Sequence, residues 1–166
     1  MAKENDAGRI SQPKSIVDCL MEIPLFDDLR DMELNTAAKH MNFFELEKDE
    51  VLFKEDDPGD YVCFIVAGEL QVLKKTSKTG QKVLIATLTK NRSIGEMSVI
   101  DNTKRSATVK ASTRSTIIAL SKRGFDQILE ENPIIGIKIL KQLSRLMSMN
   151  LRKTSSQLTG LFLPLT

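Results

Sequence analysis

The spacing of apolar residues changes twice along the chain. Residues 14–40 show the spacing of amphipathic helices. From 41 to 120 the apolar runs become short and are separated by turn-forming residues, which is typical of antiparallel strands. From 121 to 155 helical spacing returns, with Ser121 as the expected N-cap and Pro133 dividing two helices. This order predicts a mainly β domain with flanking helices.

The first helical segment has two parts. Residues 14–21 predict a short helix, and a second helical stretch begins at Pro24. In that second stretch Leu25, Leu29 and Met32 are spaced to share one apolar face.

The central segment contains about eight apolar runs within roughly 80 residues, which predicts an eight-stranded antiparallel sandwich or jelly-roll barrel. Strands are expected at 105–111 and 116–120 near its end. Gly59, Gly68 and Gly80 lie between runs, and we expect them to serve turns.

The two ends of the chain differ from the domain that they enclose. Residues 1–12 are polar and predict a disordered lead-in, so that the domain is expected to span 13–155 and the tail 156–166. The apolar stretch 161–165 lies in that tail and is too short to cross a membrane. No segment resembles a secretion signal, and the sequence predicts a cytoplasmic protein.

Charge and composition exclude several classes of site. The single histidine, His40, argues against multi-histidine metal centres, and the two separate cysteines, Cys19 and Cys63, cannot hold an iron–sulfur cluster. We find no nucleophile-and-base set and no ATP-type phosphate loop. The sequence therefore predicts a protein without a metal or catalytic activity.

The net charge of +2 hides a basic C-terminal segment, because residues 133–166 contain five Lys or Arg residues and no Asp or Glu. In the last helix Leu140, Leu143, Met147 and Leu151 form an apolar seam opposite these cations. We expect a solvated basic face and a homodimer through the seam. No helix-turn-helix follows, so binding to DNA is not favoured.

The segment 94–108 carries most of the functional information. A Gly95-Glu96 pair at an expected helix start precedes an Arg105-Ser106 pair, and the backbone N–H groups of such a start and a guanidinium can both bind a phosphate. Glu96 would repel a phosphate unless it binds a hydroxyl of the same ligand, which indicates a sugar phosphate. The alternative is a surface ion pair between Glu96 and Arg105.

Four motifs in order resemble the cyclic nucleotide-binding domain of catabolite activator proteins, protein kinase A regulatory subunits and nucleotide-gated channels. They are Gly59-Asp60, Gly68, Gly95-Glu96-Met97-Ser98 and Arg105-Ser106-Ala107-Thr108. The resemblance covers about residues 20–150 and implies a β jelly roll that binds cAMP or cGMP and needs no further cofactor.

The resemblance also implies roles for these residues. Arg105 would bind the exocyclic phosphate oxygens and Glu96 the ribose 2′-hydroxyl, while Gly95 would permit close approach. The N–H groups of Met97 and Ser98 and the Ser106 hydroxyl would complete the phosphate cradle, which Ala107 and Thr108 continue.

This sequence departs from the usual pattern at three positions. Ile94 and Lys104 stand where many members have Phe and Pro, and Ser98 replaces a small apolar residue. Neither Ile94 nor Lys104 is expected to contact the ligand. The hydroxyl after Arg105 occurs in binders of either nucleotide, and cAMP is the expected ligand.

The sequence thus predicts a cyclic nucleotide sensor that acts on an unidentified effector protein. The C-terminal helices would swing over the base as a lid, with Leu143, Leu146, Met147 or Leu151 capping it. Two alternatives remain: a degenerate domain that serves dimerisation or protein docking, and a jelly-roll enzyme that needs a metal.

Overall fold

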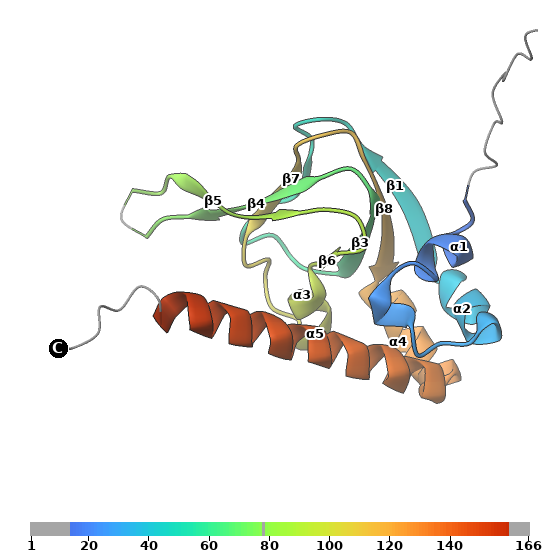
Figure 1. Cartoon of the computed structure of the whole chain (residues 1–166). Coiled ribbons are helices and arrows are strands. Elements are labelled where there is room, and N and C mark those ends of the chain that lie inside the picture. The colour runs from blue at the N-terminus through green and yellow to red at the C-terminus, as the bar shows by residue number, and fades with distance from the viewer. Residues whose placement is uncertain (1–13, 78, 160–166) are drawn as a thin grey trace, which may run out of the picture.

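The computed structural model describes residues 14–77 and 79–159 of the chain. Two four-stranded antiparallel sheets face each other, and helices cover one side of the sandwich (Figure 1). The strands are β1 (Met41–Leu46), β2 (Val51–Phe53), β3 (Tyr61–Ala67), β4 (Leu70–Lys75), β5 (Lys82–Leu88), β6 (Ser93–Ile94), β7 (Thr108–Ala111) and β8 (Ser115–Ser121). The helices are α1 (Ile16–Leu20), the 3-10 turn η1 (Pro24–Phe26), α2 (Asp31–Ala38), α3 (Glu96–Asp101), α4 (Lys122–Glu131) and α5 (Pro133–Thr159).

The strand order is β1-β8-β3-β6 in one sheet and β2-β7-β4-β5 in the other. The mainly antiparallel β architecture and its eight strands are confirmed, whereas the two sheets do not close into a barrel. Consecutive strands β1 and β2 are edge strands of different sheets. The sandwich is therefore open along this side.

Strand β3 explains why the fold has two apolar cores. Val62 and Phe64 belong to the helix-side core, in which the sheet packs against the helices. Cys63 and Ile65 lie in the core between the two sheets. Because both faces of β3 are buried, its sequence is continuously apolar rather than alternating. Phe26 contacts Phe64 edge to face, with 5.0 Å between ring centroids, and joins η1 to the sheet.

The N-terminal helical segment departs from its predicted pattern. The second stretch is interrupted, because η1 ends at Phe26 and α2 begins at Asp31, where Glu33 accepts a hydrogen bond from the Arg30 N–H. Leu25 and Leu29 are buried as their spacing predicts, but the side chain of Met32 is 83% exposed. The break between η1 and α2 resets the helical phase, so the prediction of one shared face was wrong for Met32.

The C-terminal half follows the prediction more closely. Ser121 caps α4 by accepting a hydrogen bond from the Gly124 N–H, and Pro133 begins α5. Helix α5 continues to Thr159 rather than ending near 155. The expected strands near the end of the sheet region start at Thr108 and Ser115, because residues 105–107 form a loop.

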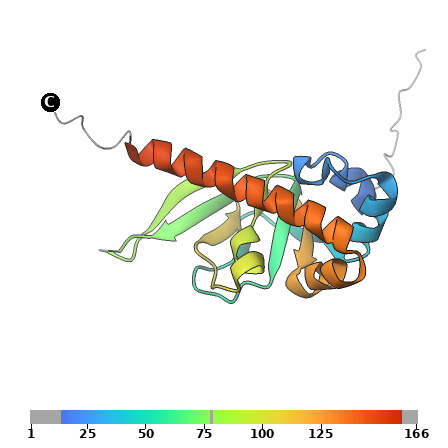
Figure 2. The same cartoon turned by 90° about the horizontal axis from the view of Figure 1, so that it is seen from below.

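Helix α5 is anchored over its first half and exposed over its second. Ile135, Ile139 and Leu143 are buried in the helix-side core, and Lys138 binds Glu33 of α2 at 2.7 Å. All side chains from Ser148 to Thr159 are exposed. Figures 1 and 2 show this second half extending past the body on the side where β4 and β5 project.

Two expectations concern segments outside the described residues, namely the lead-in 1–12 and the apolar stretch 161–165. Within residues 14–77 and 79–159, no helix is long and apolar enough to span a membrane.

Candidate functional site

A cavity of about 250 Å³ lies between α3, the loop before β7 and the neighbouring strands. It brings together seven of the eight residues that the sequence singled out. They are Gly95, Glu96, Met97, Ser98, Arg105, Ser106 and Ala107. Thr108 lies beside the cavity, where its buried hydroxyl accepts a hydrogen bond from the Glu55 N–H at 3.0 Å.

Arg105 is held by backbone oxygens and aromatic rings. Its Nη1 donates to the Gly95 carbonyl at 3.2 Å and its Nη2 to the Tyr61 carbonyl at 2.8 Å. Its Cζ lies 4.1 Å from the ring centroid of Phe53 and 4.4 Å from that of Tyr61, within the range of cation–π attraction.

The Arg105 side chain is a buried charge without an anionic partner. It is 2% exposed, and its Nε has no hydrogen-bond partner. None of the ion pairs found among residues 14–77 and 79–159 includes it. A buried cation without a salt-bridge partner is costly, and a bound anion would reduce that cost.

Glu96, the first residue of α3, is also buried. Its side chain is 8% exposed, and Oε2 has no hydrogen-bond partner. Burial raises the pKa of this carboxyl above its ordinary value, although its own backbone N–H and the charge of Arg105 act in the opposite direction. Because both residues are buried and do not form an ion pair, the alternative of a surface salt bridge is wrong.

Two glycines allow the site to assemble. Gly95 has a φ of 87°, and a Cβ there would lie 2.3 Å from Nη1 of Arg105. Gly59, which was expected to serve a turn, is needed for close approach instead. A Cβ at Gly59 would lie 2.0 Å from the Cβ of Ser98, so the loop between β2 and β3 can pack against α3 only without a side chain.

Several residues of the cavity wall were not predicted from the sequence to lie in the site. They come from β2, β4, β5, β6 and β7 and are Phe53, Val72, Lys74, Ile85, Ile94 and Val109. Ile94, expected to stay out of contact, thus lines the site, whereas Lys104 is exposed. For two of these residues the sequence did contain a usable signal. Val72 and Lys74 are two residues apart in a strand, so alternation predicts that they share one face of the sheet.

Lys74 connects β4 to the loop that carries Arg105 and Ser106. Its ammonium donates to the Ser106 carbonyl and to the Glu55 carboxylate. Replacement by methionine keeps most of the side-chain volume but loses both bonds. We expect Lys74→Met to weaken binding of an anionic ligand by about fivefold, the equivalent of roughly 1 kcal/mol. Calorimetric titration of both proteins would measure this change. An unchanged affinity would show that the two hydrogen bonds of Lys74 do not contribute to ligand binding.

Comparison with known proteins identifies the family. The sequence profile of the family "Cyclic nucleotide-binding domain" matches residues 43–132, which include the whole cavity wall. The chain belongs to the cyclic nucleotide-binding domain family. The family prediction made from the four motifs is therefore confirmed.

Relatives show where such domains occur. The chain is 31% identical to a cAMP-dependent protein kinase regulatory subunit of Yarrowia lipolytica over 71% of this chain and 31% of that protein. It is 31% identical to a cGMP-dependent protein kinase of Plasmodium berghei over 62% of this chain and 11% of that protein. The chain thus spans less than a third of either relative.

A solved structure supports the same assignment over most of the fold. A cyclic nucleotide-binding domain from Methylobacillus flagellatus superposes with a TM-score of 0.80 at 32% identity, covering 90% of this chain and 83% of that one. The two chains therefore share this fold over most of their lengths. Over the described residues, no cluster of three or more His, Cys, Asp or Glu could hold a metal ion.

Proposed function

We propose that this chain is a cytoplasmic cyclic nucleotide sensor without catalytic activity, which binds cAMP, or alternatively cGMP, in the cavity of α3 and Arg105. The observation that carries the proposal is that two buried charged side chains, Arg105 and Glu96, form no ion pair and each keep one atom without a hydrogen-bond partner. Arg105 supplies donors for a phosphate, and the unpaired Glu96 oxygen can accept a ribose hydroxyl. A ligand that carries both groups satisfies both residues at once.

Titration of nucleotide-free protein with cAMP and with cGMP by calorimetry tests this function. We expect micromolar or tighter binding of at least one nucleotide, and stronger binding of cAMP. Failure of both nucleotides to bind a folded protein would favour the degenerate docking module. The names of the relatives support either nucleotide, because they include kinases dependent on cAMP and on cGMP.

The buried Glu96 makes nucleotide affinity depend on pH. The ribose hydroxyl donates to the carboxylate, whereas the raised pKa makes Glu96 take up a proton at a higher pH than an ordinary glutamate. We therefore expect affinity to fall as the pH is lowered through this raised pKa, above the ordinary Glu range. Glu96→Gln, which cannot titrate, should bind more weakly at neutral pH and lose this dependence. The same pH slope in the variant would assign the titration to another group.

We further propose that the exposed half of α5 forms the lid over the base. Leu143 is fully buried in the helix-side core and does not cap a ligand in this conformation, whereas Leu151 is 68% exposed and Leu146 and Met147 are half-buried. Ile135, Ile139 and Leu143 anchor the first half, so removal of all of α5 would disrupt the core. Among the residues that the structure describes, a truncation after Ser148 removes only exposed helical turns.

The truncated chain should fold normally and bind cAMP about tenfold more weakly, because the base loses apolar cover on one side. Unfolding curves and calorimetry of the full and truncated chains would measure this. Equal affinities would exclude a lid from residues 149–166. The homodimer and the effector protein remain proposals that rest on the exposed Met149 and Leu151 and on the basic face of α5.

A further inference from the structure

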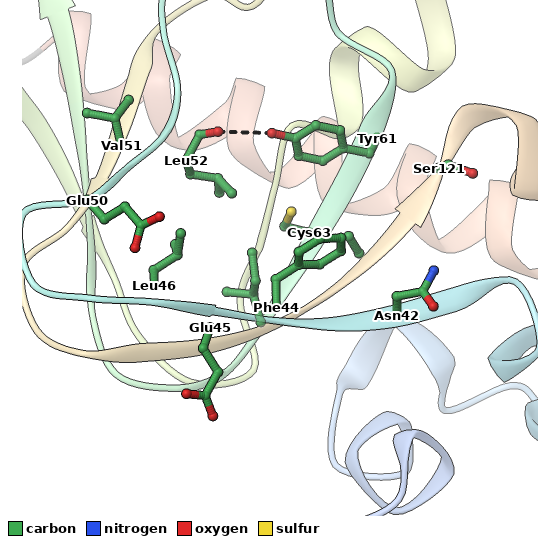
Figure 3. A pocket seen from close by; sticks show the side chains of 12 residues that line it. Asn42, Phe44, Glu45, Leu46, Glu50, Val51, Leu52, Tyr61, Cys63 and Ser121 are labelled. Carbon is green, nitrogen blue, oxygen red and sulfur yellow. Dashed lines mark hydrogen bonds between the residues drawn. The ribbon is translucent and has the colours of Figure 1, made fainter.

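A second cavity, of about 370 Å³, opens on the side where the sandwich is not closed. Strands β1, β3 and β8 form one wall and the start of β2 the other (Figure 3). It shares no lining residue with the nucleotide cavity. Its volume lies in the range of pockets for small molecules, about 300–1,000 Å³.

The cavity wall is mainly apolar and includes two aromatic rings. Phe44, Leu52 and Tyr61 surround the space, with Cys63 and Ala119 contributed by the inner sheet face. Phe44 is 51% exposed and Val51 41% exposed, although both line the space between the sheets. These side chains are exposed because β1 and β2 are not paired with each other, and a ligand would cover them.

One charge faces this apolar space. Figure 3 shows the Glu50 carboxylate pointing into the cavity, whereas Glu45 points away from it and pairs with Arg114. Glu50 accepts a hydrogen bond from the Glu47 N–H at 2.8 Å. It takes part in no ion pair within the described part of the chain. An apolar wall with aromatic rings and one carboxylate at its mouth complements an organic ammonium ion.

Tyr61 stands between the two cavities. Its hydroxyl donates to the Leu52 carbonyl at 3.0 Å within the second cavity. Its ring and its backbone oxygen hold Arg105 of the nucleotide cavity. On β2, Leu52 lines the second cavity and the next residue, Phe53, stacks on Arg105. A ligand that moves Tyr61 or β2 therefore changes the support of Arg105.

We propose that this cavity is a second ligand site for a small arylalkyl ammonium ion, and that its occupancy changes nucleotide affinity through Tyr61 and Phe53. Binding of the amine does not depend on the proposed function, whereas the coupling does. Because coupling between two sites is reciprocal, the nucleotide must change amine affinity by the same factor.

Tryptamine is a suitable probe, and 3-ethylindole is its matched neutral control. The full chain, free of nucleotide, would be titrated with each compound by calorimetry and by amide NMR. We expect tryptamine to bind with shifts concentrated at Leu52, Tyr61 and Ala119, and to bind at least fivefold more tightly than 3-ethylindole. The absence of binding, or shifts concentrated at Glu96 and Arg105, would overturn the site.

Two variants separate the contributions of charge and space. Glu50→Gln keeps the acceptor for the Glu47 N–H, and we expect it to weaken tryptamine at least fivefold while changing 3-ethylindole less than twofold. Val51→Trp places bulk at the exposed mouth and should weaken both compounds at least tenfold. Equal tryptamine affinity in wild type and Glu50→Gln would contradict recognition of an amine. Both variants would first be shown to fold by circular dichroism.

The coupling is measured by titrating cAMP and cGMP with and without saturating tryptamine. We expect the affinity of the nucleotide that binds to change at least threefold, with an equal change in tryptamine affinity when the nucleotide is saturating. Unchanged affinities would refute the coupling and leave the amine site in place. If neither nucleotide binds while tryptamine does, the proposed function fails and the second site stands.

Discussion

Replacement of Arg105 by alanine is expected to reduce cyclic nucleotide affinity by about 100-fold or more. Removing one partner of a buried charge pair costs about 3–5 kcal/mol, because the other charge is left desolvated and unpaired. In this case the phosphate would lie in a cavity that holds no other buried cation among the described residues. Calorimetric titration with the nucleotide that wild type binds would measure the loss.

Two further variants show whether a loss of affinity in Arg105→Ala reflects a specific phosphate contact or general attraction of an anion. Arg105→Lys keeps the charge but loses the planar fork that holds the Gly95 and Tyr61 carbonyls, so we expect an affinity between those of wild type and alanine. Lys104→Ala removes an exposed cation from the preceding position and should change affinity less than threefold. Similar losses in the Arg105 and Lys104 variants would indicate general attraction of an anion, and would contradict a specific phosphate contact.

Thermal unfolding of the same proteins separates binding from folding. Arg105 also packs on Phe53 and Tyr61, so its removal leaves a gap and loses the two hydrogen bonds to the Gly95 and Tyr61 carbonyls. The unliganded alanine variant should therefore unfold at a lower temperature than wild type. A folded variant that has lost nucleotide binding would support the proposed role, and a folded variant that binds normally would contradict it.

The part of the cavity around Arg105 could be predicted from the sequence because its residues are close together in the chain. One short segment contains Gly95, Glu96, Arg105 and Ser106. The residue types themselves indicate which ligand groups these side chains can bind. The rest of the cavity wall could not be predicted in the same way. Phe53, Val72 and Ile85 come from three strands, and only sheet pairing brings them to one cavity.

For the fold as well, features set by neighbouring residues in the sequence could be predicted, whereas features set by residues far apart in the sequence could not. Helix boundaries set by a local signal, such as Ser121 and Pro133, were predicted correctly. The exposure of Met32 was not, because the break before α2 changes which face meets the core. The open side of the sandwich depends on which strands become edges, which alternation of apolar residues does not specify. The second cavity could not be foreseen for that reason.

Substitution of Gly95 allows the effect of backbone strain to be separated from the effect of displacing Arg105. Gly95→Ala forces a side chain onto a φ of 87°, which costs about 1–3 kcal/mol, and places its Cβ 2.3 Å from Nη1 of Arg105. Since the Tyr61 carbonyl is also 3.2 Å from that Cβ, the guanidinium must move. We expect nucleotide affinity to fall by about 30-fold or more, together with a loss of stability.

Gly80→Ala is the matched control, because both glycines have a positive φ but their surroundings differ. Gly80 has a φ of 67°, and a Cβ there meets nothing within 4 Å. This variant should lose stability through strain while its nucleotide affinity stays within twofold of wild type. The difference in nucleotide affinity between the two variants then measures how much binding free energy is lost when the Arg105 guanidinium is displaced. If Gly95→Ala bound nucleotide as well as Gly80→Ala does, the position of Arg105 in this structure would not be the one that binds phosphate.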